Sequence, residues 1–295
     1  MIAGQILVTG GSGQVGAELR RRSADVVAPD RSHLDLEDPQ AIATFVASRP
    51  WAAVINAAAY TAVDKAELDV ARAWQVNAVA PAVLAAETAR LNIPLVQVST
   101  DYVFDGAKRE AYLPDDITGP LGVYGASKLA GEIAVRSANP RHAIIRTAWV
   151  ISAHGANFVK TMLRLGAERD HLRVVSDQHG SPTSATDIAD ALLLIAARMV
   201  DPALAGGTWH FVNRGNASWA ELAEAVFAGS VMRGASAPSV EHVTTVEYPT
   251  LARRPSNSTL DTATIERDFG IQPRPWQDAL DDILAELLDT QPSPQ

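Results

Sequence analysis

The stretch that decides the fold lies near the start of the chain, where residues 6–16 read ILVTGGSGQVG. Ile6–Val8 is a short apolar run of the kind that forms a buried strand, and Gly13–Ser23 has the pattern of a helix. The glycines at positions 10, 13 and 16 stand three residues apart, a spacing that differs from the simplest dinucleotide-binding fingerprint. They can still play the same three structural roles. They allow a tight turn, a close approach of backbone to phosphate, and packing of helix on strand. The stretch therefore predicts a βα turn whose helix start binds a pyrophosphate.

Short apolar runs alternate with helical stretches through the first half of the chain. Further strands are expected at Asp25–Ala28, Ala53–Asn56, Leu95–Ser99 and Ala143–Arg146. Helices are expected between them at Pro39–Ser48, Ala66–Leu91 and Tyr124–Ser137. Runs that are apolar on both faces are typical of parallel strands covered by helices on either side. We therefore predict an α/β fold, a Rossmann-type doubly wound parallel sheet, with an NAD(P)-binding domain over residues 1–150.

The second half of the chain has a different rhythm. Glycine, proline and turn pairs become frequent, and three helices remain recognisable, at Thr186–Met199, Ser218–Phe227 and Trp276–Leu288. Ser218 and Glu221 are spaced as in a capping box. Residues 151–295 are therefore expected to form mainly a smaller, loop-rich substrate lobe, with some return to the sheet. The tail Thr290–Gln295 is expected to be frayed.

The composition limits the class of protein. The chain has 295 residues, a formal net charge of −9 and no cysteine. The acidic balance argues against nucleic acid or an anionic membrane as a partner, because both attract a basic field. The lack of cysteine excludes disulfides and thiolate metal sites, and no apolar run approaches the ~20 residues of a membrane helix. A soluble cytoplasmic protein is expected.

Two adjacent residues at the end of the second expected strand give opposite indications about the coenzyme. Asp30 stands twenty residues after Gly10, where a carboxylate usually meets the adenosine ribose and favours NAD. Arg31 favours NADP, because a guanidinium pairs with the 2′-phosphate. NADPH is the expected coenzyme, with NADH tolerated. Asp35 and Leu36 are candidates for the adenine edge, or else for a capping cluster before the Pro39 helix.

A second group of polar residues follows the fourth expected strand. Thr100 stands at the carboxyl end of that strand, where ligands bind in such folds. Tyr124 and Lys128 are four apart on an expected helix and so share a face. A nearby ammonium favours the phenolate, so Lys128 is expected to lower the pKa of Tyr124 towards neutral pH. Tyr124 then becomes a general acid for a developing alkoxide, and Thr100 can hydrogen-bond the same oxygen.

These motifs resemble those of the extended short-chain dehydrogenase/reductases and, among them, the dTDP-4-dehydrorhamnose reductase family. The resemblance is most specific in NAAAYTAVDKAE at 56–67, STDYVFDG at 99–106, YGASKLAGE at 124–132 and RTAWV at 146–150. It continues at 157–163, 177–183 and 252–258, and so spans nearly the whole chain. The family usually has histidine where this chain has Tyr60. This difference is expected to affect a contact with the cofactor and to leave the reaction unchanged.

The resemblance implies NADPH-dependent reduction of the C4 ketone of dTDP-4-dehydro-L-rhamnose. Tyr124 would donate the proton, Lys128 would hold the nicotinamide ribose, and Thr100 would orient Tyr124. Substrate contacts are expected from Thr100, Asp101 and Trp149, with one of Arg253 and Arg254 reaching the diphosphate. Besides Tyr124 and Lys128, the expected cofactor residues are Gly10, Ser12, Gly13, Gln14, Val15, Gly16, Asp30, Arg31, Asp35, Leu36, Ala57, Ala59, Tyr60 and Thr61.

No metal site is expected in this chain. The seven histidines show no metal-ligand spacing. Some members of the resembled family bind Mg²⁺ at a carboxylate-lined dimer contact, where Glu18 could take part. Thr186 stands where such members have an acidic residue, so Mg²⁺ is not expected here. A homodimer is the assembly that the resemblance suggests.

Two other functions compete with reduction of a sugar nucleotide. The first is a sugar-nucleotide epimerase or dehydratase of the same fold. Dehydratases tend to carry an acidic pair beside the threonine, whereas Asp101-Tyr102 offers one carboxylate. The second is a non-catalytic subunit, like the regulatory subunit of methionine adenosyltransferase. The presence of Thr100, Tyr124 and Lys128 together argues against it.

Overall fold

A six-stranded parallel sheet forms the centre of the protein in the computed structural model, which describes residues 4–289. The strand order is β10-β5-β4-β3-β1-β2, and every neighbouring pair is parallel. The strands are β1 (Ile6–Thr9), β2 (Val26–Val27), β3 (Ala53–Asn56), β4 (Leu95–Thr100), β5 (His142–Thr147) and β10 (Gly207–His210). The order reverses between β1 and β3, which is where such sheets bind nucleotides. The predicted fold class is confirmed.

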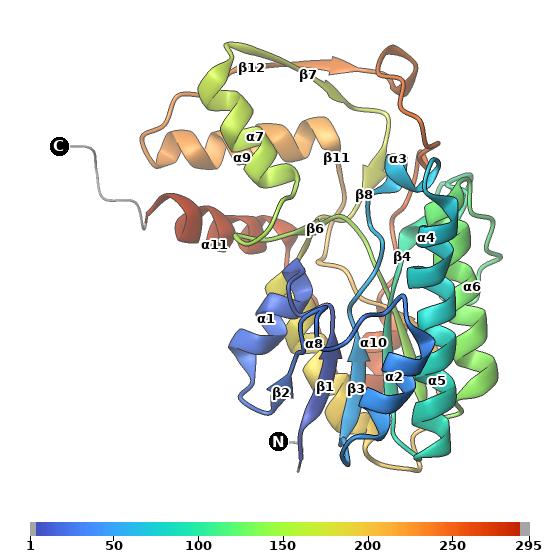
Figure 1. Ribbon diagram of the computed structural model, residues 1–295. Helices are drawn as coiled ribbons and strands as arrows, with labels where there is room; N and C mark the ends of the chain where they lie inside the picture. Colours follow the sequence, from blue (N-terminus) through green and yellow to red (C-terminus); the bar gives the residue numbers. More distant parts are fainter. Residues whose placement is uncertain (1–3, 290–295) are drawn as a thin grey trace.

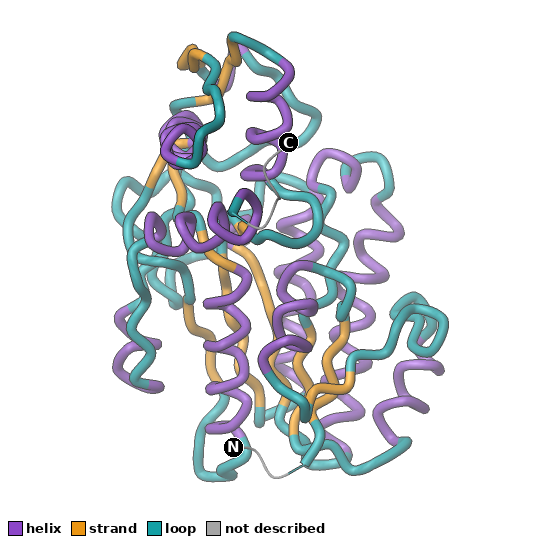
Figure 2. Tube along the Cα trace, turned by 90° about the vertical axis from the view of Figure 1, so that its left-hand side faces the viewer, coloured by secondary structure: helices purple, strands orange, loops and turns teal. Residues whose placement is uncertain are grey.

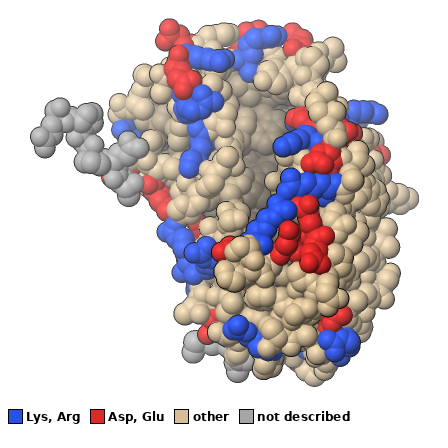
Figure 3. Space-filling view, in the orientation of Figure 1, with Lys and Arg blue, Asp and Glu red and all other residues tan. Residues whose placement is uncertain are grey.

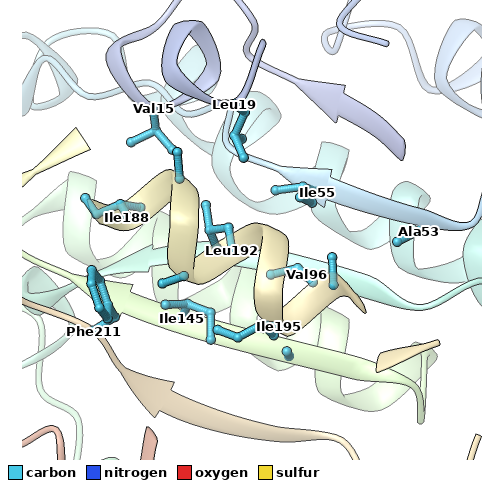
Figure 4. Close-up of a cluster of buried hydrophobic side chains, with 14 of the residues drawn as sticks. Val15, Leu19, Ala53, Ile55, Val96, Ile145, Ile188, Leu192, Ile195 and Phe211 are labelled. Carbon is cyan, nitrogen blue, oxygen red and sulfur yellow. The ribbon is translucent and has the colours of Figure 1, made fainter. Parts of the chain in front are cut away.

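Helices cover both faces of the sheet (Figures 1 and 2). One face carries α1 (Gln14–Arg22), α8 (Ala185–Met199) and α10 (Ala263–Phe269). The other carries α2 (Pro39–Ala47), α5 (Ala80–Arg90) and α6 (Val123–Ala138). Strand residues alternate between the two cores, as period two requires: Ile6 packs towards α1 and α8, and Leu7 packs towards α2 and α5. Figure 4 shows the first of these cores, with Leu19, Ile188 and Leu192 over the sheet.

The helix expected at Ala66–Leu91 is divided in the structure. It consists of α3 (Val63–Ala66), α4 (Val70–Trp74), a π-helical turn at Gln75–Val79, and α5. Pro81 has no N–H to donate to the Asn77 carbonyl, and a π turn accommodates that lost bond. The Asn77 side chain accepts from the Tyr60 N–H at 2.8 Å and donates to the Ser127 hydroxyl at 3.0 Å. The turn therefore ties the loop after β3 to helix α6.

A smaller lobe lies beyond the carboxyl edge of the sheet (Figure 1). It contains α7 (Phe158–Glu168), β7 (His171–Val175), α9 (Trp219–Met232), β12 (Ser239–Val243) and α11 (Trp276–Leu288), with β7 and β12 parallel. These elements share an apolar core of their own. Two short pairs join the lobe to the body: β6 (Val150–Ile151) with β9 (Thr183–Ser184), and β8 (His179–Gly180) with β11 (Ala217–Ser218). The capping box of Ser218 and Glu221 is confirmed at the start of α9, which continues five residues beyond the expected Phe227.

Two further expectations from the sequence concern the C-terminal tail and membrane-spanning helices. The tail Thr290–Gln295 lies outside the described residues. Within residues 4–289, no helix has the length and apolar character needed to cross a membrane.

Candidate active site

The glycine loop after β1 is shaped by close backbone contacts. Gly10 has a positive φ of 80°, and a Cβ there would lie 2.7 Å from the Ala58 backbone. A Cβ on Gly16 would lie 2.1 Å from the Gly10 carbonyl oxygen. Gly13 donates its N–H to that same carbonyl at 2.9 Å and precedes α1 as its N-cap. No acidic side chain occupies the first turn of α1, so its positive end is free to receive an anion.

A cavity of about 250 Å³ opens beside this loop at the switch point of the sheet. It is bounded by the loop, the segments after β2 and β3, and one face of α4. The expected cofactor residues that line it are Gly10, Ser12, Asp30, Arg31, Asp35, Leu36, Ala59 and Tyr60. Leu34, Glu37, Arg72 and Val76 line it as well. Glycine positions with no room for a Cβ, a helix start without an acidic side chain and a cavity at the switch point of the sheet together fit a dinucleotide.

The remaining expected cofactor residues lie outside that cavity. Val15, in the first turn of α1, points into the apolar core, and Thr61 is exposed on the loop after β3. The Gln14 side-chain oxygen accepts from Asn157 at 2.9 Å, which joins the glycine loop to the lobe. The Ala57 N–H donates to the Thr9 carbonyl at 3.2 Å. Their contacts with a coenzyme stay predictions, as do those of Gly13 and Gly16.

Asp30 is held in a tight turn at the rim of the cavity. One of its carboxylate oxygens accepts from the Ser32 hydroxyl at 2.6 Å and from the His33 ring at 2.8 Å. These hydrogen bonds lower the pKa of Asp30 to about 2. The carboxylate is therefore charged across the whole neutral range, and its fixed charge favours a ribose hydroxyl over a phosphate.

Thr100 and Tyr124 meet at the carboxyl edge of the sheet. Thr100 ends β4, and Tyr124 lies in the first turn of α6, which packs against that strand. The two side chains are hydrogen-bonded. The Thr100 hydroxyl also donates to Asp101 Oδ1 at 2.9 Å and accepts from the Tyr102 N–H at 3.2 Å. The strand end and the helix start therefore hold the phenol in one place.

The charge state of Tyr124 differs from the expectation. Burial raises its pKa to about 12, an effect that the hydrogen bond with Thr100 partly offsets. The expected lowering by Lys128 was wrong for this structure: desolvation sets the direction of the shift, and the Lys128 ammonium donates to the Val98 carbonyl at 2.7 Å. Burial lowers the pKa of Lys128 itself to about 8, with Glu132 acting in the opposite direction. Tyr124 therefore keeps its proton at neutral pH, as a proton donor must.

The expected sugar-contacting residues lie between the sheet edge and the lobe. Asp101 is 2% exposed and begins a 3₁₀ turn after β4. Trp149 adopts a positive φ of 44°, and its ring stacks on Trp219 of α9 at 3.5 Å with an interplanar angle of 5°. A positive φ in a bulky residue persists only where the surroundings impose it. Trp219, which the sequence did not single out, therefore helps to fix the Trp149 ring.

Burial of Asp101 predicts a specific pH dependence of stability. Its pKa rises from 3.8 to about 6, mainly through desolvation. Between these two values the folded state binds more protons than the unfolded one, so the free energy of unfolding falls as pH rises. We expect Asp101→Asn to gain stability relative to the wild type as the pH rises from 3.8 to about 6, and to level off above that. Urea denaturation across this range measures the difference; a constant difference would contradict it.

Arg253 and Arg254 have different surroundings. Arg254 pairs with Asp64 of α3 through two hydrogen bonds, of 2.6 and 3.2 Å. Asp64 also accepts from the Ala252 N–H at 3.0 Å. Arg253 is exposed. The pair links the lobe to the VDKAE segment, and it leaves Arg253 as the arginine whose side chain is available to a diphosphate.

Glu18, the carboxylate considered for Mg²⁺, lies beside an arginine. Arg21 lies 3.8 Å from Glu18 and 2.9 Å from Glu286, and His154 lies 3.4 Å from Glu18. Thr186 lines the same surface pocket as Glu18. Among residues 4–289, no group of three or more histidine, cysteine or acidic side chains is placed to hold a metal ion. The Arg21 guanidinium is the positive charge beside Glu18 and Glu286 in the described structure.

The fold and the site define an oxidoreductase of the extended short-chain dehydrogenase/reductase type, since a nucleotide-binding sheet edge also presents a tyrosine and a lysine one helical turn apart. Residues 4–289 match the family model described as the RmlD substrate binding domain. The chain belongs to the dTDP-4-dehydrorhamnose reductase family. It is 43% identical over 289 residues to a dTDP-4-dehydrorhamnose reductase of Sinorhizobium fredii, covering 96% of this chain and 98% of that protein.

Solved structures of the same family agree with the fold. A dTDP-4-dehydrorhamnose reductase from Clostridium acetobutylicum superposes with a TM-score of 0.90 at 36% identity, covering 96% of this chain and 99% of that one. The Bacillus anthracis enzyme in complex with NADP gives a TM-score of 0.89 at 32% identity, with the same coverage. Both matches extend over the body and the lobe.

Proposed function

We propose that this enzyme reduces the C4 ketone of dTDP-4-dehydro-L-rhamnose with NADPH to give dTDP-L-rhamnose. The observation that carries the proposal is the hydrogen-bonded pair of Thr100 and Tyr124 at the sheet edge, with Lys128 one turn along α6. Membership of the family and the NADP complex of the Bacillus anthracis relative support the substrate and the coenzyme.

The residues divide the work of a ketone reduction between them. Bound NADPH would supply a hydride to the carbonyl carbon. Tyr124 gives its proton to the carbonyl oxygen as negative charge develops there, so that the C=O group becomes CH–OH. Thr100 orients the phenol and can hydrogen-bond the same oxygen. Lys128 holds the nicotinamide ribose, and the glycine loop with the start of α1 holds the pyrophosphate.

The substrate is held from the lobe side. Asp101 and Trp149 contact the sugar, since an aromatic ring packs well on its apolar face and methyl group. Arg253 is the proposed partner of the substrate diphosphate. The single acidic residue beside Thr100 disfavours a dehydratase, because Tyr102 occupies the neighbouring position. We expect a homodimer in the cytoplasm, which light scattering and cell fractionation would test.

A coupled assay tests the reaction directly. The purified enzyme is mixed with NADPH and with dTDP-4-dehydro-L-rhamnose made by the upstream enzymes, and coenzyme oxidation is followed by absorbance. We expect oxidation that depends on the sugar nucleotide and yields one dTDP-L-rhamnose per NADPH. Formation of a new sugar without net coenzyme oxidation would instead identify an epimerase or a dehydratase. Coenzyme binding with no change in any of these sugar nucleotides would favour the non-catalytic subunit.

A further inference from the structure

Two arginines share one carboxylate at the rim of the coenzyme cavity. Arg31 Nη2 donates to Glu37 Oε1 at 2.6 Å, and Arg72 Nε donates to the same oxygen at 2.9 Å. Arg31 Nε also lies 3.5 Å from Asp35. All of these side chains line the cavity. Figure 3 shows basic and acidic side chains gathered side by side along a hollow between body and lobe.

Glu37 is fixed by its backbone. Its N–H donates to Asp35 Oδ1 at 3.0 Å, and its carbonyl accepts from Gln75 at 3.1 Å. Asp38, the next residue, caps helix α2 by accepting two N–H bonds. The backbone of Glu37 is thus held in place. Arg31, which precedes it in the chain, and Arg72, which follows it, both contact its carboxylate.

The contacts that hold the arginines to Glu37 are exchangeable. The side chains are 60% exposed for Arg31, 42% for Arg72 and 31% for Glu37. Ion pairs at such exposure contribute little to stability, so breaking them costs little. A phosphate monoester carries more charge than a carboxylate and offers three acceptor oxygens. It can therefore accept from each guanidinium group through a different oxygen, whereas both arginines donate to the same Glu37 oxygen.

We infer that Arg31 and Arg72 together recognise the 2′-phosphate of NADPH, and that Glu37 competes with that phosphate for both arginines. The inference rests on the proposed function in that a nicotinamide dinucleotide is taken as the ligand. Glu37 thereby sets how strongly the enzyme prefers NADPH over NADH. Asp30, whose charge is fixed by its own turn, adds a constant preference for the ribose hydroxyl.

Direct binding measurements test this inference without any sugar nucleotide. Dissociation constants for NADPH and NADH are measured by calorimetry, and those for 2′,5′-ADP and AMP provide a second pair that differs in the same phosphate. We expect Arg72→Met and Arg31→Met each to weaken NADPH and 2′,5′-ADP by roughly tenfold, while NADH and AMP change little. Glu37→Gln, which removes the charge and keeps the shape, should strengthen NADPH binding by roughly three- to tenfold.

A matched control separates a local effect from general charge removal. Arg90 forms a comparable exposed pair with Glu87 at 2.8 Å on α5, outside the cavity, and Arg90→Met should leave all four constants unchanged. An unchanged ratio of NADPH to NADH affinity in Arg72→Met would overturn the role of Arg72. Weaker NADPH binding in Glu37→Gln would overturn the competition, since Glu37 would then be positioning the arginines. If the ratios shift as expected but no sugar nucleotide is reduced, the proposed function fails and this inference stands.

Discussion

Replacing Tyr124 with phenylalanine is expected to lower kcat by about 10²- to 10⁴-fold, the usual contribution of a positioned general acid. The hydroxyl that Thr100 holds is lost, and with it the proton that keeps the product oxygen from remaining an alkoxide. NADPH affinity should change far less, because the glycine loop and the rim arginines are untouched. Steady-state kinetics and a coenzyme titration on the same preparation measure the two effects separately.

Tyr102→Phe provides the matched control for that substitution. The Tyr102 ring lies edge-on to Tyr124, with centroids 5.4 Å apart, and burial raises the pKa of its phenol strongly. The same atom is removed from the same neighbourhood, but Tyr102 bonds Thr100 through its backbone N–H and not through its phenol. It should therefore retain far more activity than Tyr124→Phe. Equal losses in the two variants would refute the assignment of Tyr124 as the proton donor.

Replacing Arg146 with methionine should destabilise the protein by about 3–5 kcal/mol. Arg146 of β5 makes two hydrogen bonds to Glu132 of α6, at 2.8 and 2.9 Å, and a third to the Pro114 carbonyl at 3.0 Å. The two residues are 1% and 0% exposed. Without Arg146, the Glu132 carboxylate would stay buried, and its ion-pair contact within 4 Å would be with Arg136, itself partly exposed, at 3.2 Å. Urea denaturation gives the change in unfolding free energy.

A double variant shows whether the unpaired charge causes that loss. Replacing both Glu132 and Arg146 with methionine removes the charges together, and it should recover a large part of the stability lost in Arg146→Met. Arg164→Met, which breaks an exposed pair with Glu168 on α7, should cost less than about 0.5 kcal/mol. If the double variant is no more stable than Arg146→Met, packing and not charge accounts for the effect.

The sequence predicted the features that depend on local spacing. The apolar run Ile6–Val8 and the glycines after it predicted the βα turn, and the alternation of apolar runs with helical stretches predicted the parallel sheet, because strand burial and turn geometry are set within a few residues. The i, i+4 spacing placed Tyr124 and Lys128 on one helix. The continuous helix expected from Ala66 was wrong: the chain leaves the helix at residues 67–69 and forms a π turn shortly before Pro81, and an apolar periodicity registers neither the break nor a missing N–H.

Other features depend on which distant atoms the fold brings together. Burial reversed the expected shift of the Tyr124 pKa, and the Lys128 ammonium is directed to the Val98 carbonyl. The pairs of Arg72 with Glu37 and of Arg254 with Asp64 join segments far apart in the chain. No spacing rule indicates such pairs. Asp64 lies within the NAAAYTAVDKAE stretch that resembles the family, but this stretch does not indicate that Arg254 is its partner.

The path of the chain between body and lobe limits how this protein can be altered. After β5 the chain enters the lobe, returns to the body as α8 and β10, enters the lobe again through α9, returns as α10, and ends in the lobe as α11 (Figure 1). The lobe therefore cannot be exchanged as a single cassette cut at one linker. A graft that transfers substrate preference from a relative has to replace three separate segments at once. Variation within this family is accordingly easier by single substitutions on a shared frame than by recombination of whole domains.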